Sequence, residues 1–171
     1  MKNQIISDFQ EIIHELIAIL NPLNDSELNK VPFPNSWTAG QVGDHLLKSF
    51  SVWDIFKGHT AEPKRAYDQN CKLLSDIFLN YEIKFTVEPN EFNYPSDDSI
   101  KKEILLKELT LVINDIIAFS ENNNLCLLCL DREFPNIGHL TRYEWLHFFN
   151  VHTQRHIYQL KNIAKKLKES V

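Results

Sequence analysis

The stretch TRYEWLHFFNVHTQRHIYQLKNIAKKLK, residues 141–168, carries the pattern that decides the fold. Apolar residues and histidines recur in it at steps of three and four, the spacing of one face of an α-helix. Thr141 and Glu144 have the form of a capping box, in which each side chain binds the other residue's backbone N–H at a helix start. We therefore predict one long helix to about Lys168. Its buried seam comprises Trp145, Phe149, His152, His156, Leu160, Ile163 and Leu167.

Three further segments have the same periodicity. The first runs roughly from Lys2 to Leu20 and is stopped by Asn21-Pro22. The second begins at a capping box formed by Thr38 and Gln41, runs to about Lys57 and ends at Gly58. The third runs from about Ser99 to Ser120. Four such segments predict an all-α four-helix bundle with little or no sheet.

About 40 residues separate the second and third predicted helices, which is too long for a structureless loop in a compact domain. Leu73, Leu74, Ile77 and Phe78 predict a short helix within them. The following stretch, IKFTVEPNEFNYP at 83–95, predicts an extended crossover because its prolines disfavour regular helix. A long crossover of this kind is typical of bundles whose helices do not simply alternate in direction.

Composition limits the classes of function. The 171 residues suit one domain spanning 1–171, and 43% are hydrophobic. The net charge of −5 argues against nucleic acid as the main partner. No apolar run is long enough to span a membrane, and Asp8 and Glu11 interrupt any signal-peptide core. The four glycines cannot form a phosphate-binding loop.

The three cysteines, Cys71, Cys126 and Cys129, do not form a disulfide framework, and we expect the chain to reside in a reducing cytoplasm. Cys126 and Cys129 have the spacing of a redox motif. They lie, however, inside the apolar run LCLLCL, where cysteine behaves as a small hydrophobic residue. We therefore interpret them as packing residues.

His152 and His156 stand four residues apart on the predicted buried seam, so both rings can point at one ion. The alternative is a pair of core histidines satisfied by other partners. The pair lacks the glutamate of the H-E-x-x-H motif, so a zinc-protease mechanism is not supported. His45, on the apolar side of the second helix, could supply a third nitrogen from a facing helix.

Two stretches of the chain resemble the DinB-like superfamily. SWTAGQVGDHLLKSF, at 36–50, is similar to the family's segment in which a tryptophan and a small-residue helix start precede the first metal-binding histidine. FPNIGHLTRYEWLHFFNVHTQRHIYQL, at 134–160, resembles its final helix, where Glu-Trp is followed by H-x-x-x-H and Gln-Leu. The resemblance implies an up-down-down-up four-helix bundle and the metal ligands His45, His152 and His156.

The resemblance also implies chemistry. Some relatives are thiol-dependent transferases or isomerases, and many have no assigned reaction. We expect a divalent ion, zinc or nickel, to act on a small-molecule substrate through a low-molecular-weight thiol or water. The alternative is a non-catalytic bundle stabilised by metal. The sequence leaves the catalytic residues unassigned, and leaves open whether the chain forms a homodimer.

Other side chains could contribute to such a site. His139 is interpreted as a loop residue that could also line the site mouth, and His147 should face away from His152. Gln159 is either a partner of a metal-binding histidine or an exposed residue. We expect aromatic side chains, from among Trp37, Trp53, Trp145 and Phe149, to shape a cavity, although core packing is the simpler role for Trp37 and Trp145. The acids, bases and arginines nearby in sequence have no assigned direction: Asp44, Arg142, Glu144 and Arg155.

Overall fold

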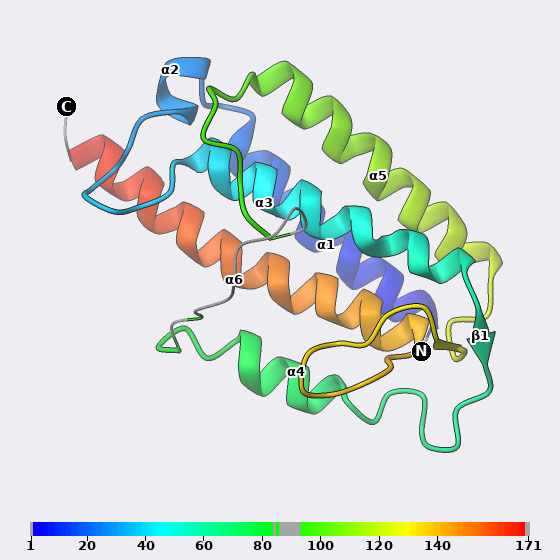
Figure 1. Cartoon of the computed structure of the whole chain (residues 1–171). Coiled ribbons are helices and arrows are strands. Elements are labelled where there is room, and N and C mark those ends of the chain that lie inside the picture. Colours follow the sequence, from blue (N-terminus) through cyan, green and yellow to red (C-terminus); the bar gives the residue numbers. More distant parts are fainter. Residues whose placement is uncertain (1, 84, 86–92, 170–171) are drawn as a thin grey trace.

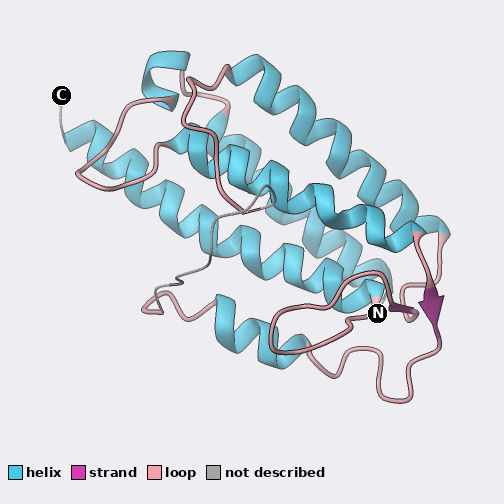
Figure 2. Cartoon of the chain, in the orientation of Figure 1, coloured by secondary structure: helices cyan, strands magenta, loops and turns pink. Residues whose placement is uncertain are grey.

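The computed structural model describes residues 2–83, 85 and 93–169, and most of them are helical (Figure 1). The predicted mostly helical class is therefore confirmed. A two-residue antiparallel pairing, Thr60 with Cys129 and Ala61 with Leu128, is the small sheet visible in Figure 2. Most of the crossover predicted at 83–95 lies outside the described residues. The elements in chain order are α1 (Lys2–Leu20), α2 (Asp25–Leu28), α3 (Ala39–Ser51), the 3-10 helix η1 (Val52–Lys57), β1 (Thr60–Ala61), α4 (Cys71–Phe78), α5 (Lys102–Asn122), β2 (Leu128–Cys129) and α6 (Arg142–Glu169).

Both predicted capping boxes are present. The Oγ1 atom of Thr38 accepts from the backbone N–H of Gln41 at 3.1 Å, and the Gln41 side chain accepts from the N–H of Thr38 at 3.1 Å. Thr141 and Glu144 make the same reciprocal pair at 3.1 and 2.9 Å. These bonds satisfy N–H groups that a helix start leaves without intrahelical partners. A third box, with Asn24 as its cap, begins α2, a short helix that the periodicity did not predict.

The second helix departs from its predicted course near its end. Regular α-helix stops at Ser51, and residues 52–57 continue as η1, which ends at Gly58 as predicted. The Ser51 hydroxyl donates to the carbonyl of Lys48 at 2.6 Å, a local side-chain bond of the kind that competes with helical backbone bonding. The short helix predicted around Leu73–Phe78 is confirmed as α4.

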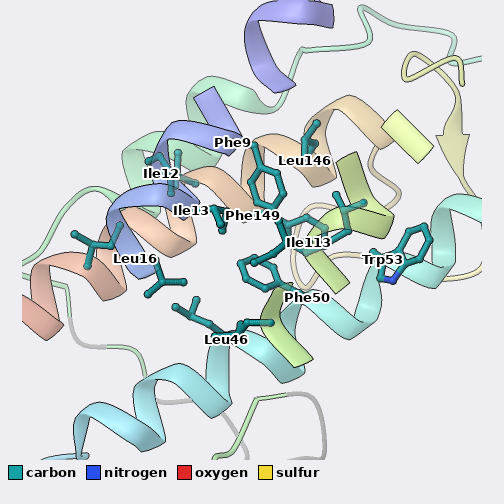
Figure 3. Close-up of a cluster of buried hydrophobic side chains, with 14 of the residues drawn as sticks. Phe9, Ile12, Ile13, Leu16, Leu46, Phe50, Trp53, Ile113, Leu146 and Phe149 are labelled. Carbon is teal, nitrogen blue, oxygen red and sulfur yellow. The ribbon is translucent and has the colours of Figure 1, made fainter. Parts of the chain in front are cut away.

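Helix α6 packs against α1, α3 and α4, while α5 packs against α1 and α3. The core between them is built from aliphatic and aromatic side chains of several helices (Figure 3). Helix α3 approaches α5 closely at Gly43, because a Cβ atom there would lie 2.7 Å from Leu105 Cδ2. Among the described residues, no helix combines the length and apolarity needed to cross a bilayer.

Candidate metal centre

The fold brings the three predicted histidines together. His45 lies in the second turn of α3, and His152 and His156 lie one turn apart on α6, which packs against α3. Their side chains are buried, with exposed fractions of 7%, 7% and 8%. Histidine is seldom buried without a partner for its ring nitrogens. Each of these rings is therefore expected to have partners for its nitrogens within the protein or in a bound ligand.

The three Nε2 atoms point toward one another. His152 Nε2 lies 3.1 Å from His45 Nε2 and 3.1 Å from His156 Nε2. Ligand atoms of all three residues lie within 4.8 Å of one another, which makes them a group able to hold a metal ion. Two nitrogens bound 2.0–2.1 Å from a tetrahedral ion are about 3.3 Å apart, so the observed spacing is close to that of a three-histidine site.

Hydrogen bonding assigns the protons on two of these rings. His45 Nδ1 donates to the backbone carbonyl of Asn93 at 2.6 Å, because a carbonyl oxygen can only accept. His156 Nδ1 likewise donates to the Gln159 side-chain oxygen at 2.9 Å. In their neutral forms both rings therefore present an Nε2 lone pair to His152.

His152 cannot satisfy both lone pairs. A neutral His152 carries at most one proton on Nε2, which can be donated fully to one neighbour only, and its buried Nδ1 atom has no hydrogen-bond partner among the described residues. The described protein groups thus leave one Nε2 lone pair of the cluster without a hydrogen-bond donor. A cation held between the three Nε2 atoms would accept all three lone pairs at once.

The protein environment favours the neutral rings that metal binding requires. Burial lowers the pKa of His45, and it lowers the pKa of His156 to about 3. Burial also holds the pKa of His152 well below its usual range, with the neighbouring histidines adding to the effect. Desolvation penalises the charged imidazolium, so the cluster keeps its lone pairs available at neutral pH.

Aromatic rings surround the three imidazoles. Trp37 lies 5.2 Å from His45 and 6.5 Å from His156 between ring centroids, and Tyr94 meets the edge of Trp37. On the other side, Phe148 stacks on His152 at 5.0 Å, and Phe78 meets the same ring at 5.6 Å. These rings limit the water that can reach the cluster.

The aromatic neighbours differ partly from the predicted set. Trp37 is half-buried beside two of the histidines, so it belongs to the site as well as to the packing. Trp145 and Phe149 are core residues, and Trp53 packs on Phe119 instead. Helical spacing could have identified Phe148, which stands four residues before His152. No local signal pointed to Phe78, which comes from α4.

Three further residues were considered from the sequence as neighbours of the histidines, and the structure places each of them. Gln159 contacts His156 directly, as one of its two interpretations required. His147 faces α4, where its Nε2 lies 2.8 Å from the Ser75 hydroxyl, so the prediction that it points away from the cluster is confirmed. His139 contacts the carbonyl of Arg132 and the carboxylate of Glu133, and it is not part of the group of three histidines, consistent with a loop role.

None of the charged residues near the histidines in sequence is aimed at the cluster. Asp44 pairs with Lys48 at 2.9 Å and accepts from the N–H of Ser96. Arg142 donates to the carbonyls of Asn124 and Phe56. These side chains are engaged in holding loops, so a general acid or base stays unassigned.

Glu144 is the centre of a second buried polar cluster, which sequence reasoning missed. Its carboxylate is fully buried and accepts two hydrogen bonds from Arg65, both at 2.7 Å. It also accepts from the backbone N–H groups of Asn70 and Thr141. Arg65 lies 79 residues away in sequence, and nothing local marks it as the partner.

Of the two cysteines interpreted as packing residues, Cys129 lies in the core and Cys126 is half-buried. Cys71, Cys126 and Cys129 are all free thiols. Cys129 is buried in the core, and burial raises the pKa of its thiol to about 12. A redox cysteine instead needs a lowered pKa, so the side chain does not suit that role.

The chain is similar in sequence to known proteins over most of its length. A family model described as the DinB superfamily matches residues 8–160. The chain is also similar to the uncharacterized protein YuaE of Bacillus subtilis (strain 168), with 24% identity over 172 residues that cover 96% of this chain and all of that protein. No solved structure matches the chain.

Proposed function

Because this chain belongs to the DinB superfamily, we propose that it is a metal-dependent enzyme whose His45, His152 and His156 hold one divalent ion, zinc or nickel. The observation that carries the proposal is the convergence of three Nε2 atoms that cannot satisfy one another by hydrogen bonding. Neutral imidazoles bind both zinc and nickel. The availability of each metal therefore determines which one occupies the site as much as affinity does. The described residues supply three ligands, and three protein ligands with an open fourth position are typical of catalytic zinc sites.

Neighbouring residues would orient the metal-binding histidines and shield them from water. The carbonyl of Asn93 and the side chain of Gln159 hold two imidazoles with Nε2 facing inward, an orientation that metal-binding histidines usually receive from such partners. Trp37, Phe78 and Phe148 exclude water. A bound dication would supply a Lewis acid that lowers the pKa of a water or thiol. We favour a low-molecular-weight thiol, because a bound thiolate is already a nucleophile and needs no base.

The competing proposal is a non-catalytic bundle whose histidines bind metal only to stabilise the fold. One observation favours it: the three imidazoles are at most 8% exposed and lie among aromatic rings. The two proposals differ in turnover. Purified, metal-loaded chain would be screened with thiols plus electrophiles, and separately with esters and amides. Turnover lost in His152→Ala supports the enzyme, while one bound ion with no turnover in either panel supports the structural role.

Metal binding itself needs a separate test. Elemental analysis of unwashed protein should find about one zinc or nickel ion per chain, and less in the His45→Ala, His152→Ala and His156→Ala variants. Unchanged metal content in all three variants would overturn the ligand assignment. The same variants identify the residues that hold the metal whichever function proves correct.

We also assign the chain to a single domain with an up-down-down-up four-helix bundle of α1, α3, α5 and α6. The course of these helices in Figure 1 supports this, since α3 and α5 run one way and α1 and α6 the other. The three free cysteines are consistent with the cytoplasmic location proposed from sequence. We propose no nucleic-acid partner, and the oligomeric state, monomer or homodimer, would be measured by light scattering.

A further inference from the structure

Arg155 lies between the two histidines of α6 and fastens the segment that follows α4. Its Nη1 atom donates to the carbonyl of Phe78 at 3.3 Å and to that of Asn80 at 2.9 Å, and its Nη2 atom donates to the carbonyl of Ile83. The guanidinium also lies over the ring of Phe85, 4.5 Å from its centroid. One side chain thus joins four residues of the α4 extension, which we define as residues 78–83 and 85, to the helix that carries His152 and His156.

The α4 extension reaches the histidine cluster through Phe78. This residue ends α4, and its ring meets His152 edge-on at 5.6 Å and Phe85 face-on at 5.3 Å. Tyr81 of the same extension stacks on Tyr158 of α6 at 4.3 Å, which is a second attachment. The position of the Phe78 ring beside His152 therefore depends on how firmly the extension is held.

His152 depends on such packing more than the other two histidines do. His45 and His156 are each oriented by a hydrogen bond from Nδ1, whereas the part of the chain that the structure describes offers no partner to the buried His152 Nδ1. Its ring is held between Phe148, which stacks on one face, and the edge-on ring of Phe78. Removing one of these rings would let the imidazole turn or let water reach Nδ1.

We propose that Arg155 is a positioning residue: by fastening the α4 extension to α6, it keeps Phe78 against His152 and so holds the Nε2 atom of His152 toward its two partners. The inference rests on the proposed function, since it concerns the same three-histidine site. Arg155 acts through Phe78, since its hydrogen bonds go to backbone carbonyls of the α4 extension.

The chemistry of the contact explains why arginine suits this position. The guanidinium has five N–H groups in a rigid plane and can serve several carbonyl oxygens at once, whereas a lysine ammonium is a point charge on a flexible chain. The carbonyl of Phe78 is at the C-terminus of α4, where backbone oxygens lack intrahelical partners and a cation is favourable. Lysine should therefore rescue the contact only in part.

The structure offers a matched control on the same helix. Arg142 also donates to backbone carbonyls, those of Asn124 and Phe56, and lies over a phenylalanine ring, Phe119, at 5.1 Å. It stands at the start of α6, away from the histidine cluster. Arg142→Met should therefore destabilise the protein by the same type of loss without altering the metal centre.

The test compares full-length wild type, Arg155→Met, Arg155→Lys and Arg142→Met after loading with Co²⁺. The visible absorption spectrum reports the geometry of the bound ion, and addition of a chelator gives its dissociation rate. We expect Arg155→Met to change the spectrum and to release Co²⁺ roughly ten-fold faster or more, the usual effect of losing support behind a ligand. Arg155→Lys should be intermediate, and Arg142→Met should match wild type in both measurements.

The results separate this inference from the proposed function. Wild type that binds Co²⁺, with Arg155→Met identical in spectrum and release rate, overturns the inference and leaves the proposed function standing. Wild type that binds no Co²⁺, Zn²⁺ or Ni²⁺ overturns the proposed function. In that case ¹⁵N NMR of the His152 imidazole in metal-free protein decides: one ring environment in wild type and averaged signals in Arg155→Met support the positioning role, and identical signals refute it.

Discussion

Helix α6 carries two buried polar clusters, and they differ in how completely they are satisfied. In the first turn, the Glu144 carboxylate receives two bonds from Arg65 and one each from the N–H groups of Asn70 and Thr141. Two turns later, the His152 imidazole has one nitrogen that meets no partner within residues 2–83, 85 and 93–169, and another that faces two competing lone pairs. Protein groups fully hydrogen-bond the Glu144 carboxylate, whereas the described residues leave one Nε2 lone pair of the histidine cluster without a donor.

This difference separates structural from functional burial of polar groups. A buried polar group costs free energy unless it is paired, so a fully bonded carboxylate can serve the fold alone. A cluster with converging lone pairs lowers stability until a cation binds, and binding then adds stability to the folded state. The fraction of polar atoms that have hydrogen-bond partners, more than burial or charge, thus indicates which cluster is a binding site.

The largest effect is expected from His152→Leu. This variant should lose essentially all bound metal, because its Nε2 is the nitrogen shared by both neighbours. The metal-free variant should nevertheless lose no more than about 1 kcal/mol of stability, since an apolar group of similar volume replaces an unsatisfied polar one. Metal analysis and urea unfolding in the presence of chelator measure the two effects.

His147→Leu is the control for that experiment. His147 is a half-buried histidine on the same helix whose Nε2 is bonded to Ser75, so its loss should weaken the fold and leave metal content near wild type. Equal loss of metal in both variants would mean that the effect is unspecific.

The second effect is expected from Glu144→Ala. Removing one partner of a buried ion pair leaves Arg65 and two backbone N–H groups without their acceptor, which should cost about 3–5 kcal/mol of unfolding free energy. Metal bound per folded chain should stay constant. Glu103→Ala, at an exposed first-turn position of α5, serves as control and should change stability little. If Glu144→Ala lost metal but kept the unfolding free energy of wild type, the two clusters would not be independent.

The third effect is a pH dependence of stability to which the buried His156 contributes. Burial lowers the folded-state pKa of His156 to about 3, while the unfolded chain takes up its proton near the ordinary value of 6.5. The unfolded state therefore binds more protons below pH 6.5, and metal-free protein should lose stability as the pH falls, by about 1.6 kcal/mol between pH 6.5 and 5 from this residue.

Denaturant unfolding of chelator-treated wild type and His156→Leu at both pH values tests this expectation. In the variant, the free energy of unfolding should fall less between the two pH values than it does in wild type, because His156 no longer contributes. Parallel pH profiles for the two proteins would show that the buried imidazole is not the source of the acid sensitivity.

The smallest effect is expected from Gln159→Ala, which removes the acceptor that orients His156. Metal affinity should fall by about ten-fold, or about 1.4 kcal/mol, with little change in the stability of metal-free protein. Gln154→Ala, at another half-buried glutamine of α6, is the control. Competition titration with a chromophoric chelator measures the metal affinity of both variants. Equal affinities for the two variants would argue that the contact between His156 and Gln159 does not support the metal site.

Local pattern predicts much of the molecule. Side chains three and four residues apart share a helix face, so the periodicity of 141–168 is enough to place His152 and His156 on one buried seam. The capping boxes at Thr38 and Thr141 are equally readable, because each involves residues only three positions apart. The short α2 and the early end of α3 were not predicted, since a few local hydrogen bonds decide such boundaries.

The amino-acid order alone specifies which residues can share a helix face: the seam of α6, the apolar side of α3, and hence the candidate set His45, His152 and His156. The packing of the helices, in contrast, sets which partners each polar group meets. Asn93 reaches His45 across 48 residues, Arg65 reaches Glu144 across 79, and Phe78 reaches His152 from another helix. Contacts between distant segments depend on how whole helices pack. The sequence around each residue therefore has no local pattern that identifies its partner.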